Sequence, residues 1–331
     1  MKKILAFLLV ISFSLYAKEL TVSILPQKYF VEKIAKDKFE VNVMVKPGFS
    51  PATYEPKTSQ MRSLSASKAY FSIGVPFEKI WLEKFESANK NMLLVDTSKG
   101  IKKIEMQAHE HHDEDEHEGH AKHEDEHDEH KNHEHHDHDH AKHDEHDHEE
   151  HNHAKHDEHD DHEEHGHKHT GLDPHVWLDP MLVKVQAKNI YEALVKIDAK
   201  NKDFYLANYK AFVKELEALN TKLENILKPY EDKAFMVFHP SWGYFAKRYD
   251  LEQISIEVQG KEPKPAQLVE LVDEAKKHNI KIVFVAPQFS QKGAKVISQS
   301  INGNTSVIDP LSYEWDKNLL KVANEIAKTY K

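Results

Sequence analysis

The sequence predicts an α/β fold of two Rossmann-like lobes with parallel sheets, joined by one long rigid helix, with a ligand cleft between the lobes. Short β-type runs alternate with helical patterns from residue 20 to 96 and again from residue 234 onward. A long apolar stripe at helical spacing separates these two regions. At 331 residues the chain is also too long for one small core and fits two lobes.

The first lobe is expected to cover residues 18–200. Apolar runs and alternation predict its strands, and breaks at Pro and Gly mark the loops between them. The expected strands are 20–24, 41–45, 69–73 and 93–96, and the expected helices are 26–35, 61–67, 77–85 and 183–197. Strands that alternate with helices in this way indicate a parallel sheet covered on both faces.

The connecting helix is expected over residues 201–229. It should begin near Asp203, a good N-cap residue, and end at Leu227, because Pro229 follows. Its apolar residues recur three and four positions apart, which gives a continuous stripe on a rod of about 35–40 Å. An intermolecular coiled coil is the alternative. We favour the connecting helix, because the pattern lasts only about four heptads and both flanks are α/β.

The second lobe is expected over residues 230–331, where the alternation starts again. The expected strands are 234–238, 251–256, 281–285 and 305–308, and helices are expected from 242, over 265–278 and 291–300, and from 314. Ligands of open α/β sheets bind at the loops that follow the strands. The loops of both lobes should therefore line a cleft.

A His-rich tract, residues 107–170, interrupts the first lobe. Between residues 109 and 169 every second or third residue is histidine, and the tract carries 25 acidic residues and 5 lysines. The net charge of the tract is therefore −20. Because the net charge of the whole chain is −11, the remaining residues carry +9. The tract holds no large apolar residue, so we expect it to be disordered in the absence of metal. The lysines of the remainder are scattered without interleaved aromatics, which gives no support for nucleic-acid binding.

The N-terminus reads as a signal peptide over residues 1–17, with two lysines before a short apolar core and Ala17 as the last residue before cleavage. The alternative is a membrane anchor, but the apolar run is too short to span a hydrocarbon core of about 30 Å. The chain has no cysteine, which excludes both a lipid-modified N-terminal cysteine and a disulfide. A soluble protein exported to the periplasm is therefore expected.

Three polar residues outside the tract occupy strand-to-loop positions beside a proline: His175, His239 and Asp309. Two imidazoles and a carboxylate leave one open position on a tetrahedral zinc ion. Each residue alone has a structural alternative, because a lone histidine near tryptophan is often a hydrogen-bonded core residue and Asp-Pro often opens a turn. Together, and next to a tract of metal-binding side chains, they predict a metal site.

Five motifs resemble the zinc- and manganese-binding solute-binding proteins of ABC importers, in particular the zinc-uptake (ZnuA-type) branch. They lie in order at 47–56, 173–180, 238–245, 260–268 and 309–311. The resemblance implies a monomer with metal in the interlobe cleft, held by His175, His239 and Asp309, and delivery to an inner-membrane ABC permease. Manganese binders usually have Glu at the second of these positions. The nitrogen of His239 favours Zn²⁺ over Mn²⁺.

The sequence departs from this family at Ala52, where the family has a histidine that serves as the first ligand. Alanine has no donor atom. A histidine of the 109–169 loop, a water molecule or Glu55 could complete the site. We favour the loop, because a flexible chain of about 60 residues has an r.m.s. span on the order of 40 Å and is tethered at millimolar effective concentration.

The sequence therefore predicts a non-enzymatic periplasmic protein that captures zinc with high affinity and delivers it to an ABC importer. The His-rich loop would serve as an auxiliary collector that binds extra Zn²⁺, Ni²⁺ or Cu²⁺ weakly, although such tracts can also vary in length without consequence. One alternative is a storage or buffering protein that acts through the tract. The other is a zinc hydrolase, which lacks support because no His-Glu-x-x-His motif occurs.

Overall fold

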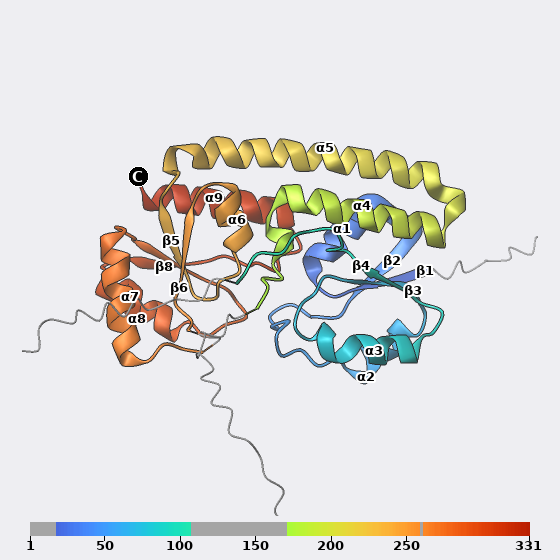
Figure 1. The fold of residues 1–331 in the computed structure, drawn as a ribbon, viewed down its shortest axis with the longest axis horizontal. Coiled ribbons are helices and arrows are strands. Elements are labelled where there is room, and N and C mark those ends of the chain that lie inside the picture. Colours follow the sequence, from blue (N-terminus) through green and yellow to red (C-terminus); the bar gives the residue numbers. More distant parts are fainter. Residues whose placement is uncertain (1–17, 107–170, 259–260) are drawn as a thin grey trace, which may run out of the picture. The chain divides into compact units, whose positions relative to one another are not determined.

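The computed structural model describes residues 18–106, 171–258 and 261–331 (Figure 1). The predicted signal peptide and the predicted disorder of the His-rich tract lie outside these residues. The described residues belong to one structural unit with two four-stranded parallel sheets. This confirms the predicted α/β fold of two lobes.

The first lobe is built on a sheet with the strand order β2-β1-β3-β4. Its strands are β1 (Lys18–Val22), β2 (Phe39–Val43), β3 (Ser67–Ser72) and β4 (Leu93–Asp96), and its helices are α1 (Leu25–Ala35), α2 (Thr58–Leu64), α3 (Glu78–Ala88) and α4 (Pro180–Ile197). Leu20 on the inner strand β1 pairs with Val41 on one side and Ala69 on the other. All three are buried, as expected for a parallel sheet covered on both faces.

Most predicted boundaries shift by one or two residues, but α4 begins three residues earlier than expected, and so does α2. The side chain of Gln60 explains this start, because its Oε1 accepts hydrogen bonds from the backbone N–H of Lys57 at 3.0 Å and from the hydroxyl of Tyr54 at 2.8 Å. A side chain that reaches back in this way satisfies one of the free N–H groups at a helix start.

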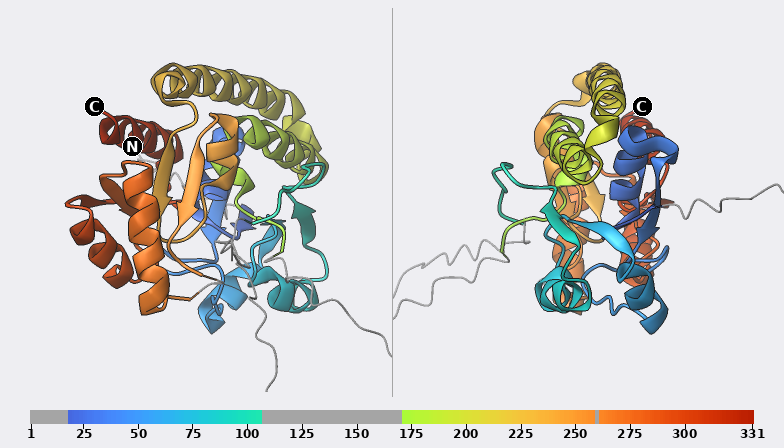
Figure 2. Two further views of the ribbon diagram at one scale, coloured as in Figure 1. Left: turned by 60° about the vertical axis from the view of Figure 1, so that its left-hand side comes forward. Right: turned by 90° about the vertical axis from the view of Figure 1, so that its right-hand side faces the viewer.

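The long helix α5 (Lys202–Leu227) links the two lobes, as the apolar stripe predicts. It packs against α1 and α4 of the first lobe and against the last helix, α9 (Trp315–Thr329), so its apolar side is covered within the chain (Figures 1 and 2). Its N-cap is Asn201, and the predicted cap Asp203 lies in the first turn. A carboxylate there still interacts favourably with the positive end of the helix dipole.

The second lobe repeats the arrangement with the strand order β6-β5-β7-β8. Its strands are β5 (Ala234–Val237), β6 (Glu252–Ser255), β7 (Ile282–Val285) and β8 (Asn304–Val307), and its other helices are α6 (Gly243–Arg248), α7 (Pro265–Lys277) and α8 (Lys292–Ser300). Met236 and Val283 face a core under α7 and α8, whereas Phe235 and Phe284 face the opposite side. This alternation follows from the two-residue period of a strand.

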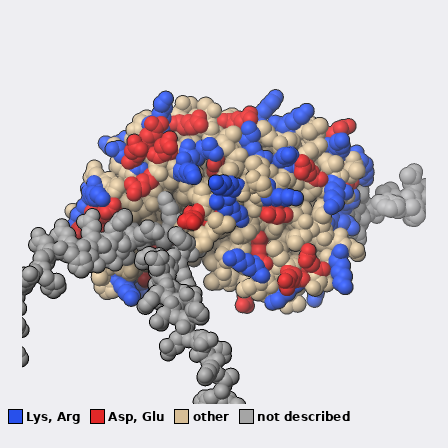
Figure 3. Space-filling model, viewed as in Figure 1, with Lys and Arg blue, Asp and Glu red and all other residues tan. Residues whose placement is uncertain are grey.

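The core on that opposite side continues without a break through α9 and α5 into the first lobe. The two lobes are therefore joined by shared apolar packing as well as by the chain. Lys and Arg intermingle with Asp and Glu over the face seen in Figure 3. Within the described residues, no helix combines the length and apolar character needed to cross a membrane.

Candidate metal centre

A cavity of about 780 Å³ lies between the two lobes. The first lobe contributes the loop after β3 and residues 171–177, and the second contributes the loops after β5, β6, β7 and β8. The carboxyl ends of parallel strands are where open α/β sheets bind ligands. The structure thus has a cavity at the place where the sequence predicts the interlobe site.

His175 lies in the wall of this cavity, in the loop before α4. The Oδ1 atom of Asp173 accepts a hydrogen bond from the backbone N–H of His175 at 2.8 Å and lies 2.7 Å from the ring Nδ1. Both residues are buried, with 8% of His175 and 1% of Asp173 exposed. Pro174 between them restricts the backbone. The ring of His175 is therefore held in one orientation before any ligand arrives.

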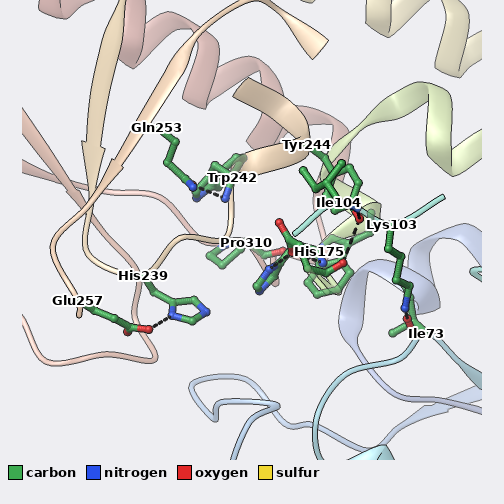
Figure 4. A network of polar contacts seen from close by, with 12 residues as sticks. Ile73, Lys103, Ile104, His175, His239, Trp242, Tyr244, Gln253, Glu257 and Pro310 are labelled. Atoms are coloured by element: carbon green, nitrogen blue, oxygen red, sulfur yellow. Dashed lines mark hydrogen bonds and ion pairs between the residues drawn. The ribbon is translucent and has the colours of Figure 1, made fainter. Parts of the chain in front are cut away.

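His239 follows β5 and brings a second imidazole to the same cavity. Its Nδ1 lies 2.8 Å from Oε1 of Glu257, and its ring stacks on Phe289 with the centroids 4.5 Å apart. The rings of His175 and His239 lie near each other on loops of different lobes (Figure 4). Their centroids are 5.5 Å apart.

This spacing suits two imidazoles on one metal ion. With a Zn–N bond of about 2.0–2.1 Å the ring centre lies about 3 Å from zinc, so two rings in tetrahedral positions have centres roughly 5 Å apart. A carboxylate beside each Nδ1 accepts a hydrogen bond from the Nδ1–H of the neutral ring, which leaves the lone pair on Nε2. His175 and His239 each have such a carboxylate, which orients and strengthens a metal-binding imidazole.

The loop that carries His175 is also tied to the second lobe. The hydroxyl of Tyr244 accepts from the backbone N–H of Ile104 and donates to the carbonyl of Asp173, both at 3.0 Å (Figure 4). The indole N–H of Trp177 donates to the carbonyl of Pro310 at 2.8 Å. These bonds place the His175 loop against the second lobe and limit how far the two imidazoles can separate.

Arg248 and Asp179 make a further link between the lobes. The guanidinium donates to both carboxylate oxygens of Asp179 at 2.7–3.1 Å, and this hydrogen bonding raises the pKa of Arg248. The same carboxylate caps α4, because its Oδ1 accepts from the backbone N–H of Met181 at 2.7 Å. One buried carboxylate thus fixes both the start of α4 and the position of α6.

The third predicted ligand, Asp309, does not line the cavity. Its Oδ1 accepts hydrogen bonds from Nε2 of Gln288 at 2.8 Å and from the backbone N–H of Leu311 at 2.9 Å. Gln288 and Leu311 themselves line the cavity. Across the described residues, no three or more His, Cys, Asp or Glu side chains already form a metal-binding group. The structure therefore brings His175 and His239 together and joins Asp309 to Gln288, a residue of the cavity wall.

Of the other two predicted positions, Ala52 and Glu55, one belongs to the cavity wall. Ala52 lines the cavity at the position where a donor atom is missing, whereas Glu55 is exposed and is not part of the cavity wall. Met106 and Gly171, the described residues on either side of the His-rich tract, both line the cavity. The backbone N–H of Met106 donates to the carbonyl of Gly171 at 3.0 Å. Both ends of the tract therefore leave the described fold at the cavity.

A buried carboxylate in the same wall belongs to Glu78, at the start of α3. Burial raises its pKa to about 7, against hydrogen bonds from the hydroxyl of Ser23 and the backbone N–H groups of Gly74 and Ile73 that favour the charged form. Glu78 is 2% exposed and joins the loops after β1 and β3. It therefore stabilises the first-lobe side of the cavity.

Sequence reasoning did not single out Glu257 or Gln288. Both follow strands of the second lobe, β6 and β7, just as His239 follows β5. The rule that selected His239 would have found them if it had been extended to every polar residue after a strand. Asp173 opens the motif at 173–180, and its contact with Nδ1 of His175 is a product of the loop geometry.

The chain is similar to several known proteins. The profile of the family described as "Zinc-uptake complex component A periplasmic" matches residues 20–331. The "High-affinity zinc uptake system protein ZnuA" of Bacillus subtilis (strain 168) is 29% identical over 305 residues, which is 89% of this chain and 80% of that protein.

Two solved structures share the fold over nearly the whole chain. A crystal structure of ZnuA is 39% identical with a TM-score of 0.75 and covers 95% of this chain and 100% of its own. A zinc-bound deletion mutant of ZnuA is 38% identical with a TM-score of 0.73 and covers 95% of this chain and 98% of its own.

Proposed function

Because the chain belongs to the family of periplasmic zinc-uptake components, we propose that it captures Zn²⁺ in the periplasm and delivers it to an inner-membrane ABC importer. Zinc is the cargo, and no chemical step is performed on it. The protein acts as a monomer after removal of residues 1–17. The continuous core through α5 and α9 favours small shifts of the lobes over wide opening.

The pair His175 and His239 carries this proposal. The 5.5 Å between their ring centroids fits two ligands of one tetrahedral ion, and each ring has a carboxylate at Nδ1. Asp309 adds an oxygen ligand through Oδ2, since both hydrogen bonds that the described residues donate to its carboxylate go to Oδ1. Two nitrogen ligands favour zinc over manganese.

The His-rich tract serves as a collector for the cavity. Its two ends leave the fold at Met106 and Gly171, which supports a tether at the site itself. Imidazoles held near the cavity raise the local metal concentration, and their weak individual affinities allow transfer inward. Binding by the tract should weaken below about pH 6, where protons compete for imidazole nitrogen.

Zinc affinity measured by chelator competition tests the proposal. His239→Ala and His175→Ala should each weaken binding by at least about 100-fold, and strains carrying either should fail to grow when zinc is limiting. His278→Ala is the matched control, because this histidine of the second lobe bonds Glu274 at 2.8 Å and does not line the cavity. If growth instead depends on the tract and not on His239, the protein is a storage protein.

A further inference from the structure

Three side chains in the cavity wall share one arrangement. His175, His239 and Gln288 each line the cavity and each bond, through a nitrogen, to a carboxylate. The carboxylates are Asp173, Glu257 and Asp309 respectively, at 2.7, 2.8 and 2.8 Å. For the two histidines this leaves Nε2 as the atom that can bind a metal ion. For Gln288 the corresponding free atom is the amide oxygen, Oε1.

The amide oxygen of Gln288 is buried and accepts no hydrogen bond. A buried acceptor without a partner costs about 1–3 kcal/mol. Turning the amide over would not help, because the oxygen would then face Oδ1 of Asp309 at hydrogen-bond distance. Among the described side chains, one other buried amide oxygen lacks a partner, that of Gln186, and it is not in the cavity wall. Gln288, a residue of the cavity wall, thus carries an unsatisfied acceptor.

Gln288 lines the same cavity as the two imidazoles. Phe289, the next residue, stacks on the ring of His239 with the centroids 4.5 Å apart. On the other side of the cavity, Ala52 offers no donor atom. A site built from His175, His239 and Asp309 therefore lacks a fourth ligand. The amide oxygen of Gln288, for its part, has no positively charged partner.

We propose that Oε1 of Gln288 is a zinc ligand that takes the coordination position left open by Ala52. This assignment rests on the proposed function. Asp309 accepts from the amide Nε2 of Gln288, which polarises the amide and makes its oxygen a better ligand. A neutral amide oxygen binds zinc less tightly than an imidazole does, so zinc should be released to the permease more readily than from a site with three histidines.

The test compares Gln288→Leu, Gln288→Glu and Gln299→Leu in the full chain. Gln299 is on the exposed side of α8 and serves as the control. Zinc affinity is measured by chelator competition, and Co²⁺ absorption reports the number and type of ligands. Gln288→Leu should weaken zinc binding by about 10–100-fold and change the Co²⁺ spectrum. Gln288→Glu keeps an oxygen donor and should retain affinity, whereas Gln299→Leu should match the parent.

An unchanged affinity and Co²⁺ spectrum in Gln288→Leu would overturn the assignment. If deletion of residues 108–169 then changes the spectrum, the fourth ligand is a tract histidine, and if it does not, the ligand is water. Either result rejects Gln288 as a ligand. His239→Ala separates this failure from failure of the proposed function, because only the latter predicts that His239→Ala also keeps its zinc. Thermal unfolding of each metal-free variant checks that it folds.

Discussion

The contact between Glu257 and His239 gives the most quantitative prediction about the site. Glu257 is 8% exposed, and its Oε1 lies 2.8 Å from Nδ1 of the imidazole. A hydrogen bond to a charged group is worth about 1.5–3 kcal/mol when buried. If this bond fixes the metal-binding tautomer, its loss should weaken zinc binding by about 10–100-fold, which is about 1.4–2.7 kcal/mol.

Two substitutions separate the charge of Glu257 from its role as acceptor. Glu257→Gln keeps an oxygen that can accept a hydrogen bond from Nδ1 but removes the charge, so its loss of zinc affinity should lie at the low end of this range. Glu257→Leu removes both and should lie at the high end. Zinc affinity is measured by chelator competition on protein stripped of metal, with circular dichroism to confirm that each variant is folded.

The control for this experiment is a second pair of the same geometry. His278 and Glu274 are also 2.8 Å apart, but they lie outside the cavity wall. Glu274→Gln should change the zinc affinity less than twofold. If Glu257→Leu binds zinc as tightly as the parent, or if Glu274→Gln weakens it equally, the proposed role of the carboxylate behind His239 is wrong.

Three further predictions concern stability and the tract. Arg248→Met leaves the carboxylate of Asp179 buried without its cation and should lower the free energy of unfolding by about 2–4 kcal/mol in urea titrations; a loss below about 0.5 kcal/mol would contradict this. Glu78, whose pKa is raised by burial to about 7, favours the folded state when protonated, so stability should fall as pH rises from about 5 to 8. Relative to the Glu78→Gln variant, the parent should lose at most roughly 3 kcal/mol of its free energy of unfolding over this pH range. If the stability of the two proteins changes with pH in parallel, this prediction is wrong. Deletion of residues 108–169 should reduce the zinc stoichiometry but leave one tight site, and loss of that site by calorimetry would count against a cavity site of His175, His239, Asp309 and Gln288.

Much of the fold could be predicted because its signals are local. The alternation of strands and helices and the apolar stripe of α5 are both properties of neighbouring residues, and both agree with the structure. His175 and His239 could be proposed for the same reason, since each follows a recognisable break beside a proline. The parallel topology explains the place of His239, which follows β5 at the carboxyl edge of its sheet. The predicted strand-to-loop position of His175 is wrong, because no described strand directly precedes it and it lies in the loop before α4.

The partners of these residues could not be predicted in the same way. Glu257 meets His239 because β6 pairs with β5, and Gln288 meets Asp309 because β7 pairs with β8. Strand order is a long-range property that no local pattern encodes. For the same reason the sequence names Asp309 as a ligand without its partner, whereas in the structure its carboxylate accepts a hydrogen bond from Gln288, a residue of the cavity wall.

Anomalous diffraction at the zinc edge from crystals of the zinc-loaded protein tests the central claim most directly. We expect one strong peak in the cavity, about 2.0–2.1 Å from Nε2 of both His175 and His239. Asp173 and Glu257 should still contact the Nδ1 atoms of the two rings. A folded body with no peak in the cavity, or a peak bonded to neither imidazole, would contradict a zinc-capture site between the lobes.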